Sequence, residues 1–222
     1  MSLLNIIPVS ENELEKLRYL SIKTFQETFS DQNTDDNINE YLRLKMNSCK
    51  LLNELKNPNT EFYFAYNKSS LIGYLKLNYK DAQTENVFEN KAFEIERIYL
   101  LKTFQNIGYG KKLFKKIVSI GKLKGYRRLW LGVWENNLPA IRFYNKLKLK
   151  TFDKHNFILG NDIQTDFLMK FDFWDQNGEP LSGSKSSKDP KTSSLFGFIL
   201  DSNSKGESKL SKSSNFPRWL VN

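Results

Sequence analysis

The chain has 222 residues, 39% of them hydrophobic and 14% aromatic, which is enough for one domain with a packed core and some excess length. Its single cysteine, Cys49, excludes an intrachain disulfide framework and a zinc cluster built from cysteines. The formal charge of +9 indicates an anionic partner, whether nucleic acid, a membrane surface or a small ligand. Neither a signal-peptide pattern nor an apolar run of membrane-spanning length is present, so we expect a cytoplasmic protein without a membrane partner.

The N-terminal part of the chain predicts a strand, several helices and a hairpin. Ser10 and Glu13 form a capping box that opens a helix, and Thr34 can cap a second one. Residues 51–55 are typical of a further helical turn or two. Strands are expected over residues 3–9, 61–66 and 71–79, the last two as a β-hairpin.

The most informative stretch, residues 93–121, predicts a strand, a short turn and an amphipathic helix with a lysine face. Gly108 and Gly110 lie in the turn. Orphan backbone N–H groups and the helix dipole converge at such a helix N-terminus, which favours an anion site. A dinucleotide fingerprint would need a third glycine where Leu113 stands, and the P-loop pattern is absent. From the glycines alone, a plain loop beside a solvated lysine face remains the alternative.

The C-terminal part predicts a buried strand, a helix and two closing strands. The apolar run 129–134 is typical of a strand covered on both faces, and Asn136 or Asn137 can cap the next helix. Residues 149–152 and 164–173 predict an antiparallel pair of strands. The order of elements indicates an α/β fold with a mixed sheet.

Composition divides the chain into two parts. Residues 1–173 form the predicted domain, whereas 174–222 are rich in Ser and Lys and predict a disordered C-terminal tail. Two short apolar islands, 195–200 and 216–221, interrupt the tail. They are either docking peptides or part of a read-through or otherwise appended extension.

Two long segments resemble a known superfamily. IERIYLLKTFQNIGYGKKLF, followed by LWLGVWENNLPAIRFYNKL, resembles motifs A and B of the GNAT superfamily of acetyl-CoA-dependent N-acetyltransferases. The stretches EIERIYL, WLGVWENN and QTDFLMKF resemble PaiA-type spermidine/spermine N-acetyltransferases in particular. The resemblance implies a GNAT fold, with a mixed, mostly antiparallel central sheet flanked by helices. It also implies an acyltransferase that moves an acetyl group to a primary amine such as spermidine or spermine, by direct attack in a ternary complex.

The same resemblance implies which residues contact acetyl-CoA. Backbone groups of Ile98, Tyr99 and Leu100 would pair with the acetyl and pantetheine part, and Asn137 would contact the pantetheine arm. Tyr144 would protonate the departing thiolate. The pyrophosphate would be wrapped by the turn residues Gln105, Asn106, Ile107, Gly108, Tyr109, Gly110 and Lys111.

The acceptor amine must lose a proton before it can attack, which requires a base or a water relay. Glu96 is the first choice and Glu94 the second, and their spacing places them on the same side of a strand. A salt bridge, for example with Arg97 or Arg142, is the alternative role of each. We expect some of the following acids to bind the ammonium groups of the substrate, the alternative being solvated surface carboxylates: Asp35, Asp36, Glu40, Asp81, Glu85 and Glu89.

Two further positions carry expectations of their own. Lys148 stands where the family usually has glycine after the tyrosine helix, so the turn there is expected to be strained or rerouted. His155, the only histidine, is predicted in a loop between the last strands, which argues against a metal site or a histidine triad.

Two other functions stay open from the sequence. One is a transcription-linked regulatory or nucleic-acid-binding protein that uses the positive charge, although no helix-turn-helix or RNA-binding pattern is present and nucleic acid is not indicated. The other is a GNAT enzyme that acts on protein amines. The expected partner is a polyamine or another small amine, and a homodimer is left open.

Overall fold

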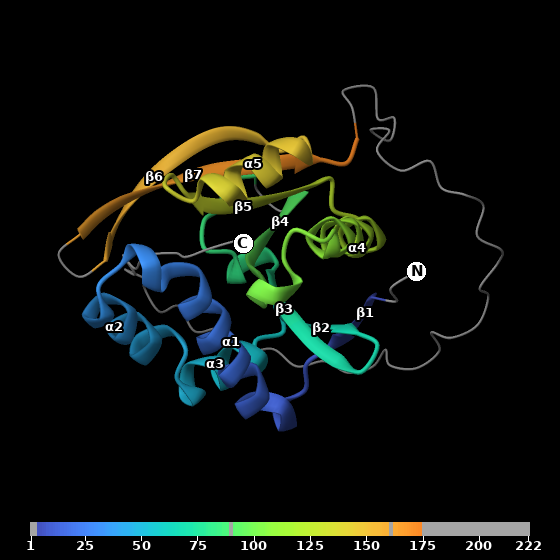
Figure 1. Cartoon of the computed structure of the whole chain (residues 1–222). Helices are drawn as coiled ribbons and strands as arrows, with labels where there is room; N and C mark the ends of the chain where they lie inside the picture. Colours follow the sequence, from blue (N-terminus) through green and yellow to red (C-terminus); the bar gives the residue numbers. More distant parts are fainter. Residues whose placement is uncertain (1–3, 89–90, 160–161, 175–222) are drawn as a thin grey trace, which may run out of the picture.

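The structure is a computed structural model that describes residues 4–88, 91–159 and 162–174 (Figure 1). The predicted tail beyond Trp174 and the acid Glu89 lie outside the described residues. The helices are α1 (Leu14–Phe29), α2 (Asp35–Lys45), α3 (Ser48–Leu55), α4 (Tyr109–Leu123) and α5 (Leu138–Lys146). The strands are β1 (Leu4–Pro8), β2 (Thr60–Asn67), β3 (Ser70–Asn78), β4 (Ala92–Leu100), β5 (Arg128–Trp134), β6 (Lys150–Leu159) and β7 (Asp162–Asp172).

Side-chain caps start the helices close to where the sequence predicts them. The Glu13 carboxylate accepts a hydrogen bond from the Ser10 N–H at 3.3 Å, just before α1. The Thr34 hydroxyl accepts from the N–H of residue 37 at 3.4 Å and caps α2. The Asn137 side chain accepts from the N–H of residue 140 at 3.2 Å and caps α5. Each cap satisfies a backbone donor that the helix itself leaves free.

One seven-stranded sheet joins the elements in the order β1-β2-β3-β4-β5-β7-β6. The pair β4–β5 is parallel and the other five pairs are antiparallel, as the mixed-sheet prediction requires. In Figure 1, α1, α2 and α3 gather on one side of the sheet, and α4 and α5 on the other. The parallel pair therefore lies at the centre of the molecule, between the two helical layers.

The sheet separates two apolar cores. On the α4 and α5 side, Phe93 and Leu131 of the sheet pack with Leu113 of α4. On the α1–α3 side, Leu17 of α1 packs with Tyr99 of β4. Side chains alternate between the faces of a strand, so β4 contributes to both cores. Burial of both faces explains why β5 is a nearly continuous apolar run.

The final hairpin is longer than predicted. The strand expected over 149–152 is β6, which extends to Leu159, so His155 lies in a strand and not in a loop. The prediction was wrong because β6 is an edge strand whose residues 153–156 are polar, which resembles a loop in sequence. In the register, His155 is opposite Asp166 of β7.

The turn after α5 keeps its ordinary path despite the missing glycine. Lys148 has a φ of 70°, in the left-handed region that glycine normally occupies. Its N–H donates to the Asn145 carbonyl at 3.0 Å, and the Leu149 N–H donates to the Tyr144 carbonyl at 3.1 Å, which is the Schellman arrangement. The turn is thus strained, as expected, but not rerouted.

Replacing Lys148 by glycine is expected to raise the free energy of unfolding by about 0.5–1 kcal/mol, because glycine enters the left-handed region without the steric penalty of a Cβ. Urea unfolding of both proteins measures the change. Lys146→Gly, at the last residue of α5, is the matched control and should instead lower stability. A loss of stability in Lys148→Gly would contradict the strained turn.

Candidate active site

The two parallel strands at the centre of the sheet separate after a short shared stretch. The register pairs Ala92 with Arg128, Phe93 with Leu129, and Glu94 with Trp130. In the described residues no further β4–β5 pair follows, although β4 continues to Leu100 and β5 to Trp134. Backbone groups of β4 beyond Glu94 therefore face a gap in the ladder, where an extended ligand can pair as a strand does.

A bulge marks the point where β4 leaves β5. Lys76 of β3 pairs with Arg97, but Leu77 pairs with Ile95, so Glu96 is an extra residue in β4. A bulge bends its strand and increases the local twist. The bend lies two residues beyond Glu94, the last residue of β4 that pairs with β5. The bulge therefore accounts for the separation of the strands.

The turn between β4 and α4 leaves the helix N-terminus open. Gly108 is the N-cap of α4 with a φ of 92°, and no side chain caps the helix there. A Cβ built on Gly108 would meet nothing within 4 Å, so the turn borders free space. The Gln105 side chain donates to the Leu100 carbonyl at 3.0 Å and ties the turn to the strand. Free N–H groups at a helix N-terminus are suited to a phosphate.

The second glycine of the turn serves packing. A Cβ on Gly110 would lie 3.0 Å from the Phe143 ring, so α4 and α5 approach closely at this point. Lys111 and Lys112, the next residues of α4, are exposed. The plain-loop alternative thus describes Gly110, while the left-handed φ and open surroundings of Gly108 fit an anion site.

Tyr144 follows the packing residue Phe143 and points into the interior. Its side chain is fully buried, and its hydroxyl lacks a hydrogen-bond partner within the part of the chain that the structure describes. The same holds for Tyr99 of β4. Burial raises the pKa of both hydroxyls well above the usual value, so they stay protonated. Unsatisfied buried hydroxyls are unusual and indicate a place for a polar ligand.

A model of the acetyltransferase (GNAT) family matches residues 14–148, which includes β4, the open turn, α4 and α5. The chain belongs to the GNAT family. The protein is therefore an N-acetyltransferase with the GNAT fold, as the resemblance implies. GNAT acetyltransferases use acetyl-CoA. The gap beside β4 and the open N-terminus of α4 lie where the sequence predicts that its extended arm and its pyrophosphate bind.

Relatives with curated names support the assignment. An N-acetyltransferase in the pepI 3′ region of Lactobacillus delbrueckii subsp. lactis is 42% identical over 170 residues, which cover 77% of this chain and 98% of that protein. The spermidine N(1)-acetyltransferase of Thermoplasma acidophilum is 28% identical over 162 residues, covering 70% and 95%. The crystal structure of the PaiA N-acetyltransferase from Thermoplasma acidophilum in complex with coenzyme A matches with a TM-score of 0.62 and 26% identity, covering 77% of this chain and 99% of that one.

The residues predicted to hold acetyl-CoA in this GNAT protein occupy two adjoining places. Ile98, Tyr99 and Leu100 form the part of β4 that follows the bulge, and residues 105–111 form the turn and the first residues of α4. Asn137 caps α5, so its side-chain oxygen already has a structural role. The roles of all these residues toward acetyl-CoA stay predictions.

The acids predicted to bind the substrate are not gathered in one place. Asp35, Asp36 and Glu40 are exposed on α2. Asp81 lies in the connection between β3 and β4 and accepts a hydrogen bond from the Asn59 side chain at 2.7 Å. Glu85, in the same connection, contacts His155.

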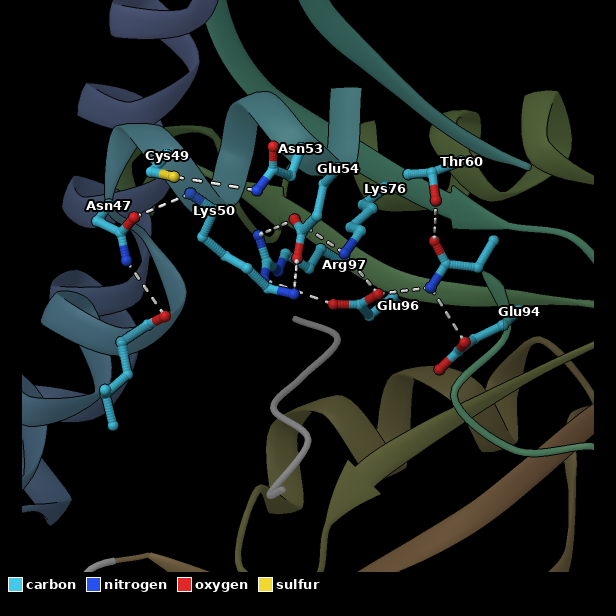
Figure 2. A network of polar contacts seen from close by, with 12 residues as sticks. Asn47, Cys49, Lys50, Asn53, Glu54, Thr60, Lys76, Glu94, Glu96 and Arg97 are labelled. Atoms are coloured by element: carbon cyan, nitrogen blue, oxygen red, sulfur yellow. Dashed lines mark hydrogen bonds and ion pairs between the residues drawn. The ribbon is translucent and has the colours of Figure 1, made fainter. Parts of the chain in front are cut away.

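The two candidate bases lie on the same side of β4, as their spacing predicts, but in different surroundings (Figure 2). Both accept a hydrogen bond from the Asn78 side chain. Glu94 is 2% exposed and also accepts from the N–H and the hydroxyl of Thr84. Glu96 forms ion pairs with Lys76 at 2.7 Å and with Arg97 at 3.4 Å.

Ion pairing changes the chemistry available to Glu96. Burial would raise the pKa of its carboxyl, but Lys76 and Arg97 hold that pKa well below the usual range. A carboxylate of such low basicity is a poor proton acceptor. The salt-bridge alternative with Arg97 is therefore present in the structure.

Sequence reasoning missed three largely buried charged residues on this side of the sheet. Glu54 of α3 and Lys76 of β3 join the ion pairs of β4, and Asp166 of β7 is 1% exposed. None of these three residues lies in a recognisable sequence motif. Alternation along the closing strand could have placed Asp166 on the same side as Leu168, but no spacing in the sequence indicates that α3 reaches β4.

His155 lies between two carboxylates and does not stand alone. Its Nδ1 is 2.7 Å from Glu85 and its Nε2 is 3.8 Å from Asp166. The two neighbouring carboxylates, Asp166 first and then Glu85, raise the pKa of His155 to about 9, from an ordinary value of 6.5. Among the described residues, no group of His, Cys, Asp and Glu has the arrangement of a metal site.

The raised pKa of His155 predicts a pH-dependent stability. Because the folded protein holds this proton more tightly than the unfolded chain, the contribution is complete below about pH 6.5 and is lost as pH rises through about 9. It amounts to at most about 3 kcal/mol, from about 1.4 kcal/mol per pKa unit. Urea unfolding at several pH values should therefore show His155→Asn far less stable than wild type at pH 6 and close to it at pH 10. A difference independent of pH would contradict this assignment.

A search of the described helices for one long and apolar enough to span a bilayer finds none.

Proposed function

We propose that this GNAT N-acetyltransferase uses a polyamine, such as spermidine or spermine, as its acceptor. Two buried carboxylates carry the proposal, namely Glu94 of β4 and Asp166 of β7. Both face away from the α4 and α5 core, because they alternate with Phe93 and Phe167, which pack there. The strand β5 lies between them. Asp166 and Glu85 together outnumber the protonated His155 that they flank, so negative charge is left at both places, and spaced negative charges match a polycation better than a small monoamine. The named spermidine acetyltransferase among the relatives supports the same acceptor.

The distribution of charge also supports two ligands of opposite sign. Between Glu96 and Asp153 the only acidic residue of the chain is Glu135. This segment contains α4 and α5, and the lysines of α4 are largely exposed. A polyanion such as acetyl-CoA is favoured on that side of the sheet, and a cationic acceptor on the side that carries the buried carboxylates.

In the proposed reaction, acetyl-CoA supplies an acetyl group activated as a thioester. The acceptor nitrogen first loses its ammonium proton. It then forms a bond to the acetyl carbon while the carbon–sulfur bond breaks, and it releases a second proton to water. Glu94 takes the ammonium proton, directly or through water, and the Tyr144 hydroxyl donates a proton to the thiolate and is later reprotonated from water. N–H groups at the start of α4 hold the pyrophosphate, and backbone groups of 98–100 hold the arm.

We infer that Glu94 is a better base than Glu96, which reverses the order expected from the sequence. The hydrogen-bond donors to Glu94 include Thr84 and Asn78, which are neutral. Glu96 is paired with two cations that lower its proton affinity. The two cations beside Glu96 lower the pKa of its carboxyl and weaken it as a base, which leaves Glu94 as the remaining candidate.

An acceptor panel tests the proposal. Thiol release from acetyl-CoA is followed with spermidine, spermine, butylamine, and a peptide that presents an N-terminal amine and a lysine. We expect kcat/KM for the two polyamines to exceed that for butylamine and for the peptide by at least about tenfold. Butylamine carries a single charge, and a peptide is too bulky to reach carboxylates that are only 1–2% exposed. A preference for the peptide, or an absence of turnover with both polyamines, would overturn the polyamine acceptor.

A further inference from the structure

A buried network of charges joins α3 to β3 and β4 (Figure 2). Glu54 of α3 lies 2.9 Å from Lys76 Nζ and 3.7 Å from Arg97 Nη1. The same two cations contact Glu96, at 2.7 Å and 3.4 Å. The four side chains are between 2% and 15% exposed. At the rim, Lys50 of α3 reaches the other oxygen of Glu54 at 3.4 Å.

This network requires the bulge in β4. In a regular strand, consecutive side chains point to opposite faces. Glu96 and Arg97 are consecutive, yet their side chains contact each other. Glu96 also contacts Lys76, Arg97 also contacts Glu54, and Lys76 and Glu54 contact each other. The extra residue at Glu96 makes this arrangement possible. The charges therefore stabilise the bulged form of the strand over a regular one.

The position of the network connects it to the cofactor-binding strand. Pairing between β4 and β5 ends at Glu94, before the network, and the residues proposed to pair with acetyl-CoA begin at Ile98, directly after Arg97. A shift of the bulge would change the orientation of every backbone group that follows it. The geometry of 98–100 thus depends on the charges that fix Glu96 and Arg97.

Glu54 provides half of the negative charge in this network. Lys76 and Arg97 face the two carboxylates of Glu54 and Glu96, so the buried charges balance. Buried ions are costly to a fold unless each is paired, and the removal of one partner leaves an uncompensated charge. Without Glu54, two buried cations would share one carboxylate. We expect β4 to shift so that the cations of Lys76 and Arg97 move apart or become exposed to water.

We propose that Glu54 is a positioning residue, which holds the bulge of β4 and so the cofactor-binding backbone of 98–100 by balancing the charges of Lys76 and Arg97. Glu54 does this from α3, an element outside the cofactor site itself. The inference rests on the cofactor site of the proposed function and is independent of the polyamine acceptor.

Binding of coenzyme A to the full-length protein, measured by isothermal titration calorimetry, tests the inference without any acceptor. Glu54→Gln keeps the size of the side chain and removes its charge, and it should raise the Kd for coenzyme A at least about tenfold, within the range known for supporting residues. Glu11→Gln is the matched control, because Glu11 forms an ion pair with Lys56 in which both side chains are 55% exposed. Its Kd should stay within about twofold of wild type.

A double variant separates charge balance from a general loss of stability. Glu54→Gln combined with Lys76→Met removes one charge of each sign, and its Kd should return to within about threefold of wild type even where its melting temperature stays lower. If Glu54→Gln does not fold, the same comparison uses Lys76→Met alone, which should bind more weakly than the double variant.

Two results would overturn the inference. One is coenzyme A binding by Glu54→Gln with the affinity of wild type. The other is a double variant that binds no better than either single variant. A polyamine assay that fails leaves this result unaffected, because coenzyme A binding needs no acceptor, so the two proposals fail separately.

Discussion

Replacing Tyr144 by phenylalanine is expected to lower kcat about 100-fold, at the low end of the range for the loss of a general acid. The Tyr144 side chain is fully buried and its hydroxyl has no protein partner among the described residues, so its removal leaves no other group unpaired. The Kd for acetyl-CoA should change less than about threefold, because the backbone of β4 and α4 is proposed to bind most of the molecule. Steady-state kinetics and calorimetry measure the two quantities.

Tyr74→Phe is the matched control for this experiment. Tyr74 of β3 is also fully buried, so this change likewise removes one buried tyrosine hydroxyl. It lies outside the proposed catalytic groups, so kcat should stay within about threefold of wild type. Wild-type turnover by Tyr144→Phe would remove Tyr144 from the proton transfer. Equal losses in the two variants would attribute the effect to the loss of a buried hydroxyl and not to catalysis.

The fold could be predicted where its signals are local. The capping side chains of Thr34 and Asn137 each accept a hydrogen bond from a backbone N–H three residues later, and the structure confirms both caps. The same is true of the turn before α4, because the strand, Gly108 and the helix are contiguous in the chain. Contiguous motifs also carry family resemblance, which explains why the sequence alone is sufficient to indicate the family.

The acceptor side could not be predicted to the same extent, because its residues come from distant elements. Glu54, Glu94 and Asp166 belong to α3, β4 and β7, and only the folded sheet brings their elements together. The bulge at Glu96 adds a second difficulty. Alternation along a strand predicts that Glu96 and Arg97 face opposite ways, and one extra residue reverses this for every later position.

The edge strand β6 shows a different limit of sequence reasoning. A strand with one neighbour can carry polar residues on much of its length, so the pattern that indicates a buried strand is missing. The sequence therefore predicts a loop at His155, whereas this residue contacts Glu85 and Asp166 from the middle of the hairpin. The histidine contributes to the packing of the β3–β4 connection against the sheet, a role that no local motif indicates.

Gly73→Ala is expected to lower the free energy of unfolding by about 3 kcal/mol, at the upper end of the usual cost of overpacking. A Cβ at Gly73 would lie 2.1 Å from the Tyr99 carbonyl oxygen and 3.1 Å from the Leu100 Cα, both backbone atoms. Backbone cannot rotate away as a flexible side chain does, so β3 and β4 would have to separate. The displaced residues belong to the strand proposed to pair with acetyl-CoA, and the Kd for coenzyme A should rise about tenfold as well.

Gly132→Ala provides the control for Gly73→Ala, because it adds the same methyl group to another strand of the same sheet. Its Cβ would lie 3.4 Å from the Asp166 carboxylate and 3.8 Å from the Leu168 side chain, which is close to ordinary contact. Urea unfolding should therefore show a loss below about 1 kcal/mol for this variant. If Gly73→Ala proved as stable as Gly132→Ala, β3 and β4 would have room to separate at Tyr99. The close approach of these strands would then not fix the position of the cofactor-binding backbone.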